Sequence, residues 1–250
     1  MSKTNQAKRP NPLIHEQVHY RGDDLLDETL TFSLSKPDPS GSEFWTQVGS
    51  SALSASMIRR SMSICGYCGL KSRKYLQVLA RNGREYDRAS LRVACIFCSQ
   101  VKTLDLVPVM RSGVLIRAPK TSQVELNIWA RAIYVGRISQ GPVAERARET
   151  LDKIMSLRDA AKAELGSEDP AHLAQQLRDR TEATAADLDA KLTGIRLFPL
   201  DRRLIREAEL EFNQFPQILA YWRSKDGPFG GMTPPQWDLD TFTPLLSRDF

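Results

Sequence analysis

The sequence predicts an α+β protein that is mainly helical, in which a small metal-binding module packs on a helical body. Three observations predict this fold class. All four cysteines of the 250-residue chain fall into two Cys-x-x-Cys pairs. From residue 123 onward, apolar residues recur at the three- and four-residue spacing of helices. Alternation at the strand period is confined to short segments before that point.

The composition excludes several classes of protein. An apolar fraction of 41% and a charged fraction of 26% are typical of a globular chain. No window has the roughly 18–20 uninterrupted apolar residues that a membrane helix needs, so we expect no direct membrane insertion. The first ten residues carry positive charge without an apolar stretch behind it, which is not a secretory signal and predicts a cytoplasmic protein.

Residues 1–43 are typical of a weakly structured N-terminal lead-in, because proline, glycine and serine interrupt them repeatedly. One strand is predicted within this segment. Leu30, Phe32 and Leu34 alternate there with polar residues, over residues 28–34.

A helical pattern over residues 44–62 opens the second unit, residues 44–120, which contains Cys65-Gly-Tyr-Cys68 and Cys95-Ile-Phe-Cys98. Two residues between thiolates let a tight turn point both sulfurs at one metal ion. Gly69 can supply the positive φ angle that such a turn needs. We therefore predict one structural Zn²⁺ per chain, with iron or an iron–sulfur cluster as the alternative metal. The four ligands are Cys65, Cys68, Cys95 and Cys98.

Other roles for the four cysteines stay open at this point. Two disulfides would need an oxidising compartment, and a redox pair would need flanking chemistry that is lacking here. The thiols can also be buried without a metal. A catalytic zinc is disfavoured, because such sites recruit histidine or carboxylate and keep one coordination position open.

Between the two pairs, alternating residues flank the turn Asn82-Gly83, and a helix is expected near residues 97–103. This order of elements is a treble-clef arrangement: a turn that contains the first cysteine pair, a hairpin, and a second cysteine pair that leads into a helix. HNH endonucleases use this scaffold. Those nucleases need histidines as the general base and as metal ligands. No histidine occurs between His19 and His172, so we expect the scaffold without the enzyme and assign no catalytic residue.

Residues 121–223 are predicted to be a helical region. Ser122 and Glu125 have capping-box spacing, and residues 123–138 are apolar on nearly all sides, which indicates a central core helix. Two amphipathic stretches joined by a short loop predict a helical hairpin over residues 142–193.

Two further helices are expected before the chain ends, over residues 201–215 and 216–223. The tail at 224–250 is rich in proline and glycine. It contains four large apolar side chains that either fold back on the body or contact a partner, namely Phe229, Trp237, Phe242 and Leu245.

Positive charge is concentrated in residues 57–120, which contain 13 Lys and Arg residues but only three acidic residues. Such a segment attracts nucleic acid or an acidic protein surface, and charge alone does not choose between them. Tyr67, Tyr75 and Tyr86 lie among these cations and can stack on bases. Part of the charge offsets the formal −2 of a zinc ion held by four thiolates.

The chain resembles the IcmJ (DotN) proteins of type IVB secretion systems. Three segments carry the resemblance most strongly: Cys-Gly-Tyr-Cys-Gly-Leu-Lys-Ser-Arg-Lys-Tyr at 65–75, Val-Ala-Cys-Ile-Phe-Cys at 93–98, and Ser-Gln-Val-Glu-Leu-Asn-Ile-Trp-Ala-Arg-Ala-Ile-Tyr-Val at 122–135. The later Pro-Gln-Ile-Leu-Ala-Tyr-Trp-Arg at 216–223 fits as well.

This resemblance implies an HNH-like zinc module that binds protein. The chain is then expected to be a non-catalytic adaptor of a secretion or conjugation coupling complex, in the cytoplasm and peripheral to the inner membrane. Its expected partners are the C-terminal extension of the coupling ATPase and other subunits of that complex, and its expected role includes substrate recruitment. The alternative is a DNA-binding or degenerate nuclease-like module, with nucleic acid as a less favoured partner.

Overall fold

The computed structural model describes residues 30–35, 52–80 and 91–229. The helices are α3 (Ala52–Arg60), α4 (Ile96–Lys102), α5 (Val107–Met110), α6 (Gln123–Arg137), α7 (Pro142–Ser156), α8 (Arg158–Leu165), α9 (Pro170–Arg178), α10 (Glu182–Leu192), α11 (Phe215–Arg223) and the 3-10 turn η2 (Leu104–Leu106). The strands are β1 (Leu76–Ala80), β2 (Leu91–Cys95), β3 (Gly113–Arg117), β4 (Ile195–Pro199), β5 (Leu204–Glu207) and β6 (Leu210–Asn213).

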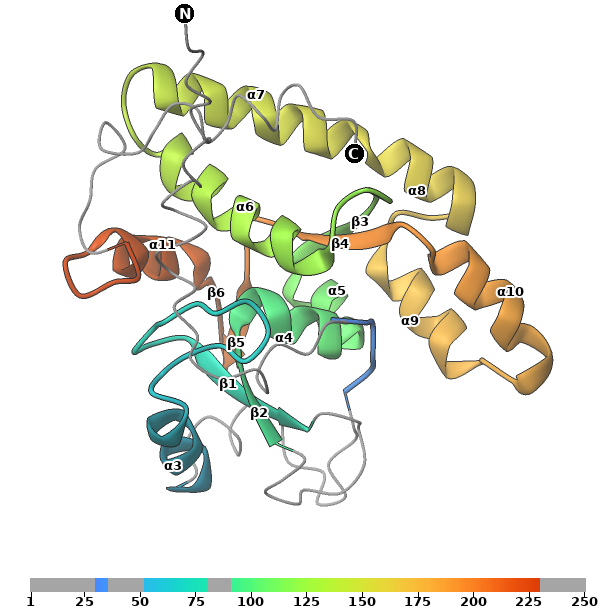
Figure 1. The fold of residues 1–250 in the computed structure, drawn as a ribbon, viewed down its shortest axis with the longest axis horizontal. Coiled ribbons are helices and arrows are strands. Elements are labelled where there is room, and N and C mark those ends of the chain that lie inside the picture. The colour runs from blue at the N-terminus through green and yellow to red at the C-terminus, as the bar shows by residue number, and fades with distance from the viewer. Residues whose placement is uncertain (1–29, 36–51, 81–90, 230–250) are drawn as a thin grey trace, which may run out of the picture.

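The predicted mixture of helices and small sheets is present, with α6 at its centre (Figure 1). Eleven of the 15 residues of α6 are buried, because α7, β4, α4 and α11 all contact it. The predicted capping box starts this helix: the Glu125 N–H donates to Ser122 Oγ at 3.2 Å, and the Ser122 N–H donates to Glu125 Oε2 at 2.9 Å. The description of residues 123–138 as a central core helix is confirmed.

Three two-stranded antiparallel sheets form within the described residues: β1–β2, β3–β4 and β5–β6. In β3–β4, Leu115 faces Leu197, and neighbouring groups bind the outer edges of both strands. The Leu115 N–H donates to the Glu168 carbonyl at 2.9 Å. On the other edge, the Gln123 side-chain amide accepts from the Leu197 N–H at 2.8 Å and donates to the Leu197 carbonyl at 2.7 Å. This small sheet therefore has few unpaired edge groups.

The expected hairpin of two helices over residues 142–193 is wrong in detail, because each helix is broken. At the first break, the Leu157 carbonyl accepts from the Arg117 N–H of β3 as well as from Ala161. At the second break, Thr181 and Thr184 form a new capping box that starts α10. As a result, α8 packs mainly on β3, while α9 packs on η2 and α5.

The helix expected over residues 201–215 is also wrong, because strands β5 and β6 form a hairpin there and β4 precedes them. Ala208 adopts a left-handed φ of 51° in the turn of this hairpin. Asn213 Oδ1 accepts from the backbone N–H groups of Arg203 and Phe215, which fixes the end of β6 against the start of α11. The predicted short helix at 216–223 is present as α11.

The N-terminal segment is extended but forms no strand over residues 30–35, unlike the prediction. Its Ser33 exchanges backbone hydrogen bonds with the end of α4, donating to Val101 and accepting from Leu104, each at 3.0 Å. The predicted helix at 44–62 is present from Ala52, and residues 44–51 lie outside the described ranges. Of the tail anchors, Phe229 is buried in the core, and the other three lie outside the described residues.

No helix in the described ranges combines the length and the apolar character that a membrane crossing requires.

We predict that Gln123→Met lowers the free energy of unfolding by about 2–4 kcal/mol, because a buried N–H and a buried carbonyl of Leu197 both lose their partner. Gln175→Met is the matched control on exposed α9, with an expected change below about 0.5 kcal/mol. Urea unfolding followed by circular dichroism measures both. Equal stability of the two variants would contradict the bridging role of Gln123.

Candidate metal centre

The first cysteine pair lies in a tight loop before β1. The Cys65 N–H donates to the Leu70 carbonyl at 2.9 Å, and the Gly69 N–H donates to the Cys65 carbonyl at 3.0 Å. Gly69 has a φ of 72°, the left-handed conformation predicted for the end of this turn. The loop therefore presents both Cys65 and Cys68 on its inner side.

The second pair comes from the junction of strand and helix. Cys95 is the last residue of β2, and Cys98 lies in the first turn of α4. The Gly66 N–H donates to the Val93 carbonyl at 2.8 Å, which joins the first loop to β2. A Cβ atom at Gly66 would lie 2.9 Å from Arg92 Cγ, so any larger residue would force the Arg92 side chain to shift.

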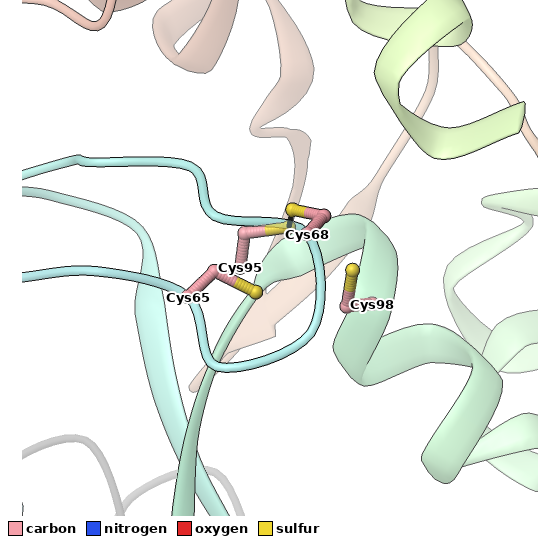
Figure 2. Close-up of side chains that lie close together, drawn as sticks. All are labelled: Cys65, Cys68, Cys95 and Cys98. Atoms are coloured by element: carbon pink, nitrogen blue, oxygen red, sulfur yellow. Dashed lines mark hydrogen bonds between the residues drawn. The ribbon is translucent and has the colours of Figure 1, made fainter. Parts of the chain in front are cut away.

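The four cysteine side chains lie close together between the first loop and the junction of β2 and α4, as Figure 2 shows. All four sulfurs lie within 4.8 Å of one another, and the Cys68 and Cys95 sulfurs are 3.6 Å apart. Four thiolates at zinc–sulfur distances of about 2.3 Å occupy a tetrahedron with edges of about 3.8 Å. All four cysteines are buried and none forms a disulfide. The cluster predicted from the sequence is present, and its ligand set is compatible with a single structural metal site.

Two side chains of α6 contact the sulfurs, and the sequence analysis missed both. Asn127 Nδ2 donates to Cys98 Sγ at 3.4 Å. Arg131 donates to Cys95 Sγ at 3.5 Å through one guanidinium nitrogen and to Cys68 Sγ at 3.4 Å through the other. A sequence signal existed: Gln123, Asn127 and Arg131 repeat every four residues, which places three polar side chains on one face of an otherwise apolar helix.

The contact between Arg131 and the sulfurs is electrostatic as well as steric, because the guanidinium carries a positive charge. The side chain is buried at 2% exposure, and no carboxylate pairs with it in the part of the chain that the structure describes. Burial alone would lower the pKa of Arg131, but attraction from the surrounding cysteine sulfurs outweighs burial and raises it above its ordinary value. Arg131 thus remains a buried cation, and it needs anionic sulfur beside it.

The thiols themselves do not ionise evenly. Hydrogen bonds from the three other cysteines, together with the charge of Arg131, lower the pKa of Cys68. Burial raises the pKa of Cys65 and of Cys98. Four thiolates in one buried cluster repel one another, so a bound cation would stabilise them, and four soft sulfur ligands favour zinc or iron over magnesium or calcium. Zinc bound here would carry a formal −2 with its ligands, which Arg131 would reduce to −1.

No protein-family model matches this chain, and no curated protein matches it in sequence.

We predict that purified protein carries one zinc ion per chain and that Cys68→Ser loses it. The variant should be insoluble or locally unfolded, because metal ligation contributes on the order of 10 kcal/mol in small zinc domains. Elemental analysis and proteolysis of both proteins provide the measurement. Wild-type protein without zinc or iron would contradict the metal site.

We further predict that Arg131→Met speeds zinc loss to a chelator by about ten- to a hundredfold, the usual range for partners of metal ligands. Arg203→Met is the matched control, because Arg203 is also buried and its guanidinium Nε donates to Gln214 Oε1 at 3.1 Å rather than to a cysteine turn. Its release rate should stay within about threefold of wild type. Equal rates for the two variants would show that Arg131 acts only through packing.

Proposed function

We propose that this protein is a non-catalytic, zinc-containing adaptor in the coupling complex of a type IVB secretion or conjugation system. It binds the C-terminal extension of the coupling ATPase together with other subunits and helps to recruit substrates. It works in the cytoplasm, held at the inner membrane by the complex.

One observation carries this proposal. The cysteine pairs and the segment at 122–135 each resemble the IcmJ (DotN) proteins, and the residues of these separate motifs contact one another. Asn127 and Arg131 donate to three of the four cysteine sulfurs. The two motifs therefore form one physical unit, which supports treating the resemblance as a whole rather than as a common metal pattern.

The surroundings of the sulfurs support a structural metal over a catalytic one. Catalytic zinc keeps an open position for water or substrate. Here the thiols are buried, and Asn127 and Arg131 occupy space beside three of them. A metal ion held here would order the loop, β2 and α4 around itself.

The same proposal includes a treble clef of the HNH type, formed by the first loop, β1–β2 and α4. Such nucleases carry histidine at two positions that are occupied here by the buried residues Leu79 and Ser99. Leu79 is 6% exposed, and the Ser99 hydroxyl donates to the Ile96 carbonyl at 2.9 Å inside α4. Neither side chain can activate water for phosphodiester hydrolysis, so a binding role fits these positions better.

A basic hollow beside the first loop suits an acidic segment of a partner protein. Its volume is about 300 Å³, and its lining includes three cations, Lys71, Arg73 and Lys225, and one carboxylate, Asp226. The Arg73 N–H donates to the Tyr221 hydroxyl at 3.0 Å, which fixes the loop against α11. Among the described residues, no carboxylate forms an ion pair with these three cations, so their charge is available for a partner.

The DNA-binding alternative rests on the same cations but has weaker support from the aromatic residues. Tyr67 is only 1% exposed, with Arg92 and Lys102 over its ring. Tyr75 packs edge-on against Tyr221 at 5.7 Å between ring centroids. The Tyr67 ring is therefore covered, Tyr75 is only partly exposed, and Tyr86 lies outside the described residues. Stacking supplies much of the affinity for single strands, so this alternative is weakened at Tyr67.

We predict that the full chain co-elutes with the C-terminal segment of the coupling ATPase in size-exclusion chromatography, without nucleic acid and at moderate salt. The double variant Lys71→Glu and Arg73→Glu should weaken the complex at least tenfold, because it reverses charge in the basic hollow. The control with the same charge change is Arg148→Glu with Lys162→Glu, on the exposed faces of α7 and α8.

Failure to co-elute, together with tight binding of a DNA oligonucleotide that weakens steeply with salt, would favour the nucleic-acid function instead.

A further inference from the structure

A second cavity lies between the N-terminal segment, the start of α6, the α9–α10 connection and β4. Its volume is about 510 Å³, within the usual range of small-molecule sites. Six apolar side chains form part of its lining: Leu30, Phe32, Val124, Leu177, Leu192 and Ile195. The residues that line this cavity are all different from those that line the basic hollow.

Most of the polar groups in this cavity already form hydrogen bonds or ion pairs with other groups of the protein. The Gln123 amide bonds both backbone groups of Leu197 and also donates to Asn127. Ser122 caps α6, and Arg180 pairs with Asp189 at 2.7 Å. These groups therefore shape the cavity but leave no unpaired charge in it.

Arg196 is the exception. Its Nε donates to the Thr121 carbonyl and its Nη1 to the Ile195 carbonyl, both at 2.7 Å. These two hydrogen bonds hold the guanidinium in a fixed position, and both of their acceptors are neutral carbonyl oxygens. The side chain is partly buried, and its burial lowers its pKa, a sign that the charge lacks compensation. Across the described ranges, no carboxylate forms an ion pair with it.

We propose that this cavity binds a small amphipathic monocarboxylate, an apolar chain or ring that ends in one carboxylate. The apolar part lies along the walls, and the carboxylate pairs with Arg196. Such an ion pair is stronger than one in water, because the surroundings are partly desolvated, and the fixed guanidinium loses little entropy when it forms. A cationic ligand would meet an unpaired positive charge. A neutral ligand would leave Arg196 uncompensated.

The test uses full-length, zinc-loaded protein and decanoate as the probe, below its micellar concentration, in isothermal titration calorimetry. We expect saturable binding of one decanoate per chain. Decanol and decylamine carry the same chain without the negative charge, and acetate carries the carboxylate without the chain. Each of these three should bind at least tenfold more weakly than decanoate.

Two variants locate the site. Arg196→Gln should weaken decanoate binding at least tenfold, and Val124→Glu should abolish it, because the new carboxylate fills the cavity and repels the probe. Val124 is in the first turn of α6, where an acidic residue is tolerated. The control is Arg206→Gln on exposed β5, which makes the same charge change away from the cavity and should stay within twofold of wild type.

Three results would overturn the proposal: no saturable binding of decanoate, equal affinity for decanol or decylamine, or unchanged affinity in Arg196→Gln that is still folded by circular dichroism. The partner-binding experiment is independent of this one, since it depends on the basic hollow and on a protein segment.

Discussion

The buried contact between Arg131 and the cysteine sulfurs is the interaction on which the rest of the structure depends. A guanidinium that is 2% exposed needs a negative partner, and here that partner is sulfur rather than carboxylate. Arg131 belongs to the central helix α6, while the sulfurs belong to the small module formed by the first loop, β2 and α4. This charge interaction therefore helps to join the module to the helical body, and residues of both parts belong to one hydrophobic core.

The parts of the fold that were predicted correctly are those encoded in local spacing. The cysteine pairs form tight turns that depend on a few neighbouring residues, and Gly69 has the predicted positive φ. The capping box of Ser122 and Glu125 is likewise local. For the β1–β2 pair, the alternation on both sides of the predicted turn was sufficient. Such signals do not need a distant partner, so a single sequence carries them.

Most of the parts that were missed depend on distant partners. Strand β4 pairs with β3, some 80 residues earlier. The β5–β6 hairpin at residues 204–213 is an exception, because its paired residues are close in the sequence and the helix predicted there was wrong. At the break between α7 and α8, the Leu157 carbonyl accepts a hydrogen bond from Arg117 of β3, a partner about 40 residues earlier. Asn127 and Arg131 were overlooked for another reason: an apolar pattern on nearly all sides of α6 concealed the polar residues repeating at every fourth position. Polar residues on an otherwise buried helix require partners, and that requirement was the available signal.

This polar face of α6 links three features that lie apart in the sequence. Arg131 and Asn127 bind the sulfurs, Asn127 accepts from Gln123, and Gln123 holds the backbone of Leu197 in β4. The residue before Leu197 is Arg196, which lines the second cavity. Hydrogen bonds along one face of α6 therefore connect the cysteine sulfurs to β4, the strand that carries Arg196. A fixed binding group loses less entropy when a ligand arrives, so the hydrogen bonds that hold β4 beside α6 would also favour the binding that we propose at Arg196.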